Sequence, residues 1–340
     1  MFKANTTWDI IGLGEVMLRL SPTGRETLAQ GGTFEKNIGG SELNVISGAA
    51  RFGAKCAMLT KFPDNVIGHF AAEKVRAGCV DDSLLAFDRA SGARLGLYYY
   101  ESGAYPRKSS VVYDRAGSSV RSFEINEIPE SVYTSTKIFH VSGITLALGG
   151  TLRKTAIEAI KRFHEGGARI SFDVNYRAAL WSEEEARSVI ERVFPYVDFL
   201  FVSEETSRRM LQRTGTLEDI LKGYAADYGC TVVASTKRQA LSPTRHNFGS
   251  LLYCDGEFYT EPPYESIEVV DRIGSGDAYL SGVLYGLLST GDAQKALEYG
   301  NAASSVKNTV MGDMIVNSRS DIEGVIRSHK AEDPQDELNR

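Results

Sequence analysis

The chain has 340 residues, of which 42% are hydrophobic, so it can bury a sizeable core, and we expect one large domain with a smaller attachment. Its formal net charge of −6 argues against a nucleic-acid partner, which would require a basic face. No apolar run approaches membrane-spanning length and residues 1–8 do not resemble a signal peptide, so we expect a cytoplasmic protein with no membrane partner.

Short apolar runs alternate with segments of helical periodicity along most of the chain. In residues 41–52 the apolar side chains recur at helical spacing, and Gly53 follows as a C-cap. Strands that alternate with helices predict a mostly parallel sheet covered on both faces, with ligands bound at the carboxyl ends of its strands. The expected strands cover 9–14, 56–62, 137–142, 169–174, 198–202 and 231–234, and the expected helices cover 41–52, 70–77, 152–163 and 217–227.

Two β-prone stretches, 17–37 and 94–124, interrupt this alternation and contain no helical pattern. We expect them to form a small antiparallel sheet that projects from the core, either as a lid over a site or as a surface through which identical chains pair. Surface hairpins without a function are an equally supported alternative. The core then comprises 1–16, 38–93 and 125–330, and residues 331–340 form a polar tail.

The segment 271–277 carries the clearest chemical signal. Gly274 and Gly276 precede an apolar helical pattern, so backbone N–H groups at the helix start are free to bind an anion such as phosphate. Asp277, in the first turn, is placed to accept a proton from an attacking hydroxyl. A plain helix cap is the alternative interpretation of the same spacing.

Two motifs together resemble the signatures of a known family. The segment D-R-I-G-S-G-D-A-Y at 271–279 lies late in the chain, and I-G-G-S-E-L-N-V at 38–45 is followed by R-F-G-A at 51–54. Their order resembles that of the ribokinase-like carbohydrate kinases, the phosphofructokinase B-type family. The resemblance implies an α/β fold with a Rossmann-type three-layer core and a β-sheet lid. It also implies transfer of the γ-phosphoryl group of ATP to a sugar hydroxyl with Mg²⁺ present.

The resemblance assigns roles to the glycine-rich segment and to the nucleotide side of the site. Gly274, Ser275 and Gly276 would form the anion hole, with Ser275 where the family usually has alanine, and Asp277 would be the general base. The family contacts ATP at the positions of Ser203, Thr236, Lys237, Arg238 and Asn301, although it often has asparagine at Ser203, and Glu205 would organise Mg²⁺ through water. Solvated surface charges are the alternative for the basic residues.

Within the family the chain resembles the 2-keto-3-deoxygluconate kinases, which phosphorylate a sugar acid to its 6-phosphate. A sugar acid carries a carboxylate, and arginine pairs with a carboxylate through two parallel hydrogen bonds. In this acidic protein, Arg115 and Arg177 would supply that positive charge, with surface salt bridges as the alternative. The sugar-binding positions implied by the resemblance are Gly40, Asn44, Tyr98, Tyr113, Arg115, Arg177 and Asp313.

Three other functions fit parts of the sequence. A kinase for a neutral sugar such as fructose or tagatose would use the same base and leave both arginines structural. An NAD-dependent dehydrogenase is suggested by Gly12 and Gly14 after the first strand, but this run lacks the third glycine of the full fingerprint. A non-catalytic sugar-binding protein on the kinase fold is disfavoured by the intact Asp277 and its glycines.

Overall fold

The structure, a computed structural model, describes residues 2–242 and 244–331, so the predicted polar tail lies almost wholly outside the described residues. A ten-stranded sheet forms the centre, in the order β13-β12-β11-β10-β9-β8-β1-β4-β5, with β14 paired to β12. Neighbours from β11 to β5 are parallel, whereas β12 pairs antiparallel with β11, β13 and β14. The strands are β1 (Trp8–Leu13), β4 (Cys56–Pro63), β5 (Leu85–Asp88), β8 (Thr136–Ser142), β9 (Arg169–Asp173), β10 (Phe199–Phe201), β11 (Val232–Ser242), β12 (Arg245–Cys254), β13 (Glu257–Tyr259) and β14 (Tyr264–Glu268).

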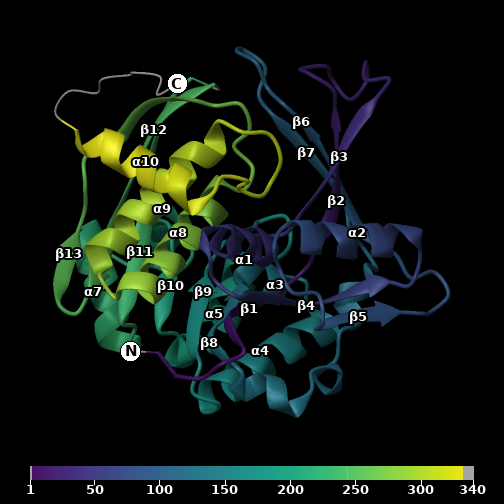
Figure 1. Cartoon of the computed structure of the whole chain (residues 1–340), viewed down its shortest axis with the longest axis horizontal. Helices are drawn as coiled ribbons and strands as arrows, with labels where there is room; N and C mark the ends of the chain where they lie inside the picture. The colour runs from purple at the N-terminus through teal and green to yellow at the C-terminus, as the bar shows by residue number, and fades with distance from the viewer. Residues whose placement is uncertain (1, 243, 332–340) are drawn as a thin grey trace.

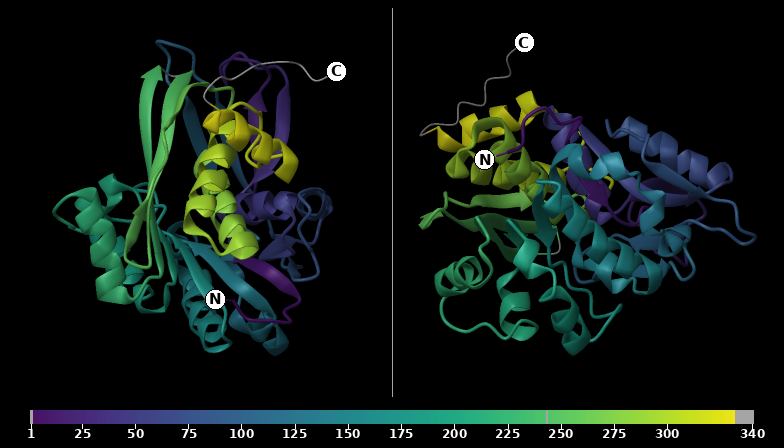
Figure 2. Two further views of the ribbon diagram at one scale, coloured as in Figure 1. Left: turned by 60° about the vertical axis from the view of Figure 1, so that its left-hand side comes forward. Right: turned by 90° about the horizontal axis from the view of Figure 1, so that it is seen from below.

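Helices cover both faces of this sheet, which makes three layers (Figures 1 and 2). Consecutive residues of β1 point to opposite faces. Ile10 belongs to a hydrophobic cluster that includes side chains of α1, α2, α8 and α9, and Ile11 belongs to another that includes side chains of α4, α5 and α7. The helices are α1 (Ser41–Phe52), α2 (Val66–Ala77), α3 (Gly143–Ala147), α4 (Gly150–Glu165), α5 (Glu183–Ile190), α6 (Glu204–Arg209), α7 (Leu217–Tyr228), α8 (Ser275–Thr290), α9 (Ala293–Asn308) and α10 (Arg319–Lys330), with 3-10 turns at Ser119–Ser122, Ile125–Glu127, Glu130–Thr134 and Phe194–Tyr196. The predicted α/β core is confirmed.

A second, small sheet stands beside α1 and α2 and projects from the core (Figure 1). Its strands are β2 (Met17–Pro22), β3 (Phe34–Gly39), β6 (Gly96–Glu101) and β7 (Ser110–Asp114), in the order β3-β2-β6-β7. The expectation of a wholly antiparallel sheet is wrong for the central pair, because β2 and β6 run parallel. Each hairpin is antiparallel by itself, and the two hairpins leave the core in the same direction, so their inner strands run side by side.

The start of α1 and the start of α8 come together where the strands of the large sheet end. A Cβ atom on Gly48 of α1 would lie 2.7 Å from the Cβ of Ser281 of α8, so only glycine permits this approach. Ser281 Oγ also donates a hydrogen bond to the Val45 carbonyl oxygen at 2.8 Å. This packing fixes two helix N-termini at the carboxyl edge of the sheet, where α/β proteins bind ligands. No helix of the described residues has the length and apolar content needed to cross a membrane.

Candidate active site

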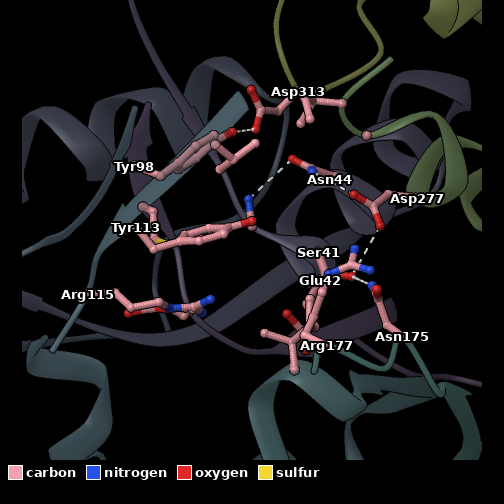
Figure 3. A pocket seen from close by; sticks show the side chains of 18 of the residues that line it. Ser41, Glu42, Asn44, Tyr98, Tyr113, Arg115, Asn175, Arg177, Asp277 and Asp313 are labelled. Atoms are coloured by element: carbon pink, nitrogen blue, oxygen red, sulfur yellow. Dashed lines mark hydrogen bonds and ion pairs between the residues drawn. The ribbon is translucent and has the colours of Figure 1, made fainter. Parts of the chain in front are cut away.

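A cavity of about 880 Å³ lies between the small sheet and the carboxyl edge of the large sheet. Most of its walls come from the start of α1, strands β6 and β7, the end of β9 and the segment after it, the start of α8 and the segment after α9, and single residues of α3 and β11 also line it. Figure 3 shows Asp277 and Asn175 on one side, and Tyr98, Tyr113 and Arg115 on the small-sheet side. Of the residues predicted from sequence, the cavity brings together Gly40, Asn44, Tyr98, Tyr113, Arg115, Arg177, Arg238, Gly274, Ser275, Gly276, Asp277 and Asp313.

The start of α8 faces the cavity without a side-chain cap. Gly274 adopts a left-handed conformation with φ of 80°, and a Cβ atom there would lie 2.8 Å from the Asp313 carbonyl carbon, so both conformation and space require glycine. The space in front of Gly276 is open, because a Cβ atom added there meets nothing within 4 Å. An uncapped helix N-terminus beside open space can bind an anion through its N–H groups and its dipole.

Asp277 lies in the first turn of α8 and accepts two hydrogen bonds from α1. Asn44 Nδ2 donates to Oδ2 at 2.7 Å, and Ser41 Oγ donates to Oδ1 at 3.1 Å. Burial deep in the cavity raises the pKa of Asp277 to about 6, although these bonds and the charge of Arg177 act to lower it. A carboxylate of this pKa is ionised at neutral pH and is a stronger base than an ordinary aspartate.

A second carboxylate, Asp173, ends β9 and lines the same cavity. Burial and the negative charge of Asp277 together raise the pKa of Asp173 to about 7, against the opposing charge of Arg177. Arg177 is exposed and makes no ion pair within 4 Å among the described residues. Its guanidinium group is therefore available to a ligand carboxylate at this side of the cavity.

Arg115, the other predicted carboxylate ligand, is buried and bound to Glu15. Its Nε donates to Glu15 Oε2 at 2.7 Å and its Nη2 donates to the same oxygen. Its guanidinium group also lies over the Tyr113 ring, with Cζ 5.4 Å from the ring centroid. Among the described residues Nη1 and the second N–H of Nη2 have no hydrogen-bond partner, but the paired charge of Glu15 means that Arg115 contributes less net positive charge to the cavity than Arg177 does.

At the small-sheet side, three separate segments meet in a buried ionic cluster around Arg19 of β2. Arg19 Nη2 lies 2.7 Å from Asp271 Oδ2, and Nη1 lies 2.9 Å from Asp313 Oδ1. The Tyr98 hydroxyl of β6 donates to the other oxygen of Asp313. Asp271 Oδ1 accepts from the N–H of Ile273, so the cluster reaches the loop that precedes α8.

A comparison with known proteins decides what kind of protein carries this site. The pattern of the pfkB family carbohydrate kinase matches residues 9–319. The chain belongs to the pfkB family of carbohydrate kinases. The fold and family predictions are thereby confirmed, and the protein is a carbohydrate kinase.

Relatives of this kinase carry names with related substrates. A 2-dehydro-3-deoxygalactonokinase from Haloferax volcanii is 34% identical over 325 residues, which is 96% of this chain and 98% of that relative. The crystal structure of a 2-dehydro-3-deoxygluconokinase from Thermotoga maritima has a TM-score of 0.90 and 34% identity, covering 94% of this chain and 98% of that one. A 5-dehydro-2-deoxygluconokinase from Clostridium perfringens is 28% identical over 311 residues, 90% of this chain and 88% of the relative.

The residues predicted on the nucleotide side of the kinase are dispersed. Ser203 and Thr236 line a second cavity of about 180 Å³, which shares Asp173, Asn175, Arg177 and Gly276 with the first. Lys237 is exposed and lines neither cavity.

Asn301 and Glu205 also lie outside both cavities. Asn301 is fully buried, and its amide group bonds Ser250 and Glu261 at 2.8 Å each, so the structure does not bring it to the site. The side chain of Glu205 is 82% exposed and pairs with Arg209 at 3.4 Å. Among the described residues, no three His, Cys, Asp or Glu side chains are grouped closely enough to hold a metal ion.

Packing explains the two glycines that suggested a dinucleotide site. Gly12 and Gly14 lie in and just after β1, under α1. A Cβ atom on Gly14 would overlap the buried Glu42 carboxylate, and one on Gly12 would press against Ile46. These glycines let α1 approach the sheet, so in this kinase they give no support to a dehydrogenase.

Sequence reasoning missed several polar residues in or beside the cavity, among them Arg19, Ser41, Asp173 and Asn175. Asp173 carried a usable signal, because an acid that ends a buried strand of a parallel sheet lies where ligands bind. Asn175 adopts a positive φ of 32°, which no sequence pattern of this chain announced. Arg19 lies 294 positions from its partner Asp313, and Ser41 lies 236 positions from Asp277, so neither pair was visible as a local motif.

Proposed function

We propose that this kinase transfers the γ-phosphoryl group of ATP to a hydroxyl of a sugar acid, 2-keto-3-deoxygluconate, and forms its 6-phosphate. The observation that carries this proposal is the arrangement around Asp277. One cavity holds a carboxylate with a pKa of about 6, an uncapped helix N-terminus and the guanidinium group of Arg177, which forms no ion pair with any described residue. The names of the relatives at 34% identity support a sugar acid of this kind.

In the proposed reaction Asp277 accepts the proton of the attacking hydroxyl as that oxygen bonds to the γ-phosphorus. The bond between the γ-phosphorus and the β,γ-bridging oxygen breaks, and ADP leaves with that oxygen. The N–H groups at the start of α8, beside Gly274 and Gly276, stabilise the negative charge on the transferring group. The proton ends on Asp277 and passes to solvent after the products leave.

Magnesium would accompany the nucleotide in this reaction. It usually binds through substrate phosphates, waters and one or two carboxylates rather than through a protein cage. This agrees with the absence of a three-acid group among the described residues. Asp173 lines both cavities and is the carboxylate that could contact such an ion through water, whereas the position of Glu205 does not favour its predicted role. Bound magnesium would neutralise phosphate charge.

Arg177 and the N–H groups of Arg115 that do not bind Glu15 would bind the sugar carboxylate. Tyr98 and Tyr113 would cover the sugar from the small sheet. The test is a coupled assay of ADP release with magnesium and ATP. It compares kcat/KM for 2-keto-3-deoxygluconate, 2-keto-3-deoxygalactonate and fructose. We expect both sugar acids to exceed fructose. A preference for fructose would overturn the sugar-acid assignment and favour the neutral-sugar kinase.

We also propose that two copies pair through the small sheet. Phe34 of β3 and Val112 of β7 support this, because their large apolar side chains are 41% and 51% exposed. Light scattering after size exclusion would compare the wild type with Val112→Glu. A dimer that becomes a monomer in the variant is expected, and a wild-type monomer at micromolar concentration would refute the pairing.

A further inference from the structure

The base Asp277 is held by side chains that reach it from two other elements (Figure 3). Ser41, the first residue of α1, donates to Asp277 Oδ1 at 3.1 Å. Asn175, two residues beyond the end of β9, donates from Nδ2 to Ser41 Oγ at 3.0 Å. Ser41 therefore links the segment after β9 to the carboxylate on α8.

The chemistry of these groups fixes the direction of the hydrogen bonds. An amide nitrogen donates and cannot accept, so Ser41 Oγ accepts from Asn175 and has its single proton left for Asp277. Asn44 Nδ2 donates to the other oxygen of Asp277 at 2.7 Å. Both carboxylate oxygens thus receive hydrogen bonds from neutral donors, and this arrangement favours the ionised form.

The backbone at Asn175 also indicates that this residue has a specific role in the site. Its φ of 32° lies in the left-handed region, which asparagine tolerates better than most residues do. The N–H of Asn175 donates to Asp173 Oδ1 at 3.1 Å, which holds the turn. Unusual backbone conformations of this kind persist where the surrounding structure requires them, and they concentrate at functional sites.

We propose that Ser41 and Asn175 are positioning residues that orient Asp277 and keep it ionised for proton transfer. The inference rests on the proposed role of Asp277 as general base, and it adds the groups that make that role possible at neutral pH. The need for them follows from the surroundings, because burial opposes ionisation of Asp277 and other acids face the same space. The charged groups that act on Asp277 are Glu42 of α1, Asp173 of β9, Arg177 after β9 and Lys307 of α9.

The decisive experiment measures the ionisation of Asp277 directly, without relying on any substrate. Carboxyl-¹³C NMR of protein labelled at aspartate would be titrated, with the Asp277 signal assigned by its loss in Asp277→Asn. We expect Ser41→Ala to raise the pKa of Asp277 by about one unit, the size of a lost hydrogen bond to a charged group. Ser41→Thr, which keeps the hydroxyl, should restore the wild-type value.

A matched control is available on the same helix. Ser47 of α1 is buried and donates to the Gly78 carbonyl oxygen at 2.9 Å, away from the cavity. Ser47→Ala should leave the Asp277 titration unchanged. A Ser41→Ala titration that matches wild type within about 0.3 unit would overturn the inference, because a lost hydrogen bond should move it further.

Kinetics separates this inference from the proposed function. With the sugar acid as substrate, Ser41→Ala should shift the acidic limb of kcat/KM upward by about one pH unit and leave the KM for ATP unchanged. Retained activity in Asp277→Asn would refute the general-base role itself. An inactive Asp277→Asn together with an unshifted pH profile in Ser41→Ala would refute only the positioning role.

Discussion

Asp277 on the one hand and Asp271 with Asp313 on the other form two groups of aspartates with different partners, and of these three residues Asp277 and Asp313 line the cavity. Asp277 is bound by the neutral side chains of Ser41 and Asn44. Asp271 and Asp313 are bound by the guanidinium group of Arg19 at 2.7 and 2.9 Å. A neutral donor orients a carboxylate and leaves its negative charge uncompensated, whereas a buried cation neutralises it. The first group is suited to proton transfer and the second to holding segments together.

The position of Arg19 shows which parts of the chain the ionic cluster joins. Arg19 is 1% exposed, lies on β2 of the small sheet, and has Cζ 4.4 Å from the centroid of the Tyr100 ring. Burial alone would lower the pKa of Arg19, but Asp313 and Asp271 raise it above its ordinary value, so the guanidinium group stays charged. The small sheet is therefore fixed at its base to the loop that leads into α8. Closure over a sugar would have to involve its outer part.

The largest effect is expected from Asp277→Asn, which removes the proposed base and keeps the shape of the side chain. Asparagine can accept from Asn44 and donate to Ser41, so the fold should remain intact. General-base catalysis contributes about 10²–10⁴-fold, and we expect kcat to fall by at least that range. The measurement is kcat with 2-keto-3-deoxygluconate and ATP, with ATP affinity as the control. A variant that keeps more than about a tenth of wild-type kcat would contradict the assignment.

Arg19→Met removes the cation at the centre of the buried ionic cluster. Methionine is apolar, so Asp271 and Asp313 would remain buried without their ion-pair partner, while the charge of the buried Lys307 would still act on both. Removal of one partner from a buried pair costs about 3–5 kcal/mol of unfolding free energy. Urea unfolding at pH 8 would measure this loss.

An exposed ion pair provides the control for Arg19→Met. Arg245 lies 3.5 Å from Glu268, and both side chains are exposed, so Arg245→Met should cost less than about 1 kcal/mol. The penalty for Arg19→Met should shrink at pH 5, because the unpaired carboxyl groups can then bind protons. Equal losses in both variants would show that the buried cluster is not a special stabilising element.

Arg177→Lys tests the substrate side of the cavity. Lysine keeps the positive charge but loses the planar geometry that binds a carboxylate through two hydrogen bonds. A charge-assisted hydrogen bond contributes about 1.5–3 kcal/mol, so kcat/KM for the sugar acid should fall by roughly ten- to a hundredfold. Fructose, which has no carboxylate, should be affected little. Parallel losses on both sugars would assign Arg177 to the phosphates or to the fold.

The smallest expected effect concerns stability and pH. Burial raises the pKa of Asp277 to about 6 in the folded protein, above the ordinary value of about 3.9, so its ionised form destabilises the fold. Asp277→Asn should therefore raise Tm by a few degrees at pH 8. The gain should decline as the pH falls through about 6, where wild-type Asp277 becomes protonated. Differential scanning calorimetry at several pH values would measure it.

The buried ionic cluster around Arg19 provides a comparison for the effect of Asp277→Asn on Tm. Asp313→Asn loses its ion pair with the buried Arg19, so it should lower Tm at pH 8. If Asp277→Asn and Asp313→Asn both lowered Tm to the same extent, the distinction between neutral and charged partners would fail.

Hydrophobic patterns in the sequence predicted helices and strands well where one face of the element is buried and the other exposed, or where both faces are buried. The helix predicted over 41–52 has those bounds in the structure, and the helix predicted over 217–227 ends one residue later. Strand β11 was predicted to end at 234 but continues to Ser242, because its outer half is exposed and polar and carries no apolar pattern. The small sheet was predicted as strands, but the parallel pairing of β2 with β6 depends on contacts that are distant in sequence.

By itself the sequence determined the alternating core, the kinase family and the placement of Asp277 beside an uncapped helix start, since each depends on residues that are neighbours along the chain. Only the tertiary structure decided which side chains surround that aspartate. Ser41 and Asn175 reach Asp277 because α1, β9 and α8 converge at one edge of the sheet. Arg19 reaches Asp313 across 294 positions for a similar reason. Burial raises the pKa of both Asp277 and Asp313, and the partners that each meets act to lower it. Those partners are brought together by the convergence of strands and helices in space.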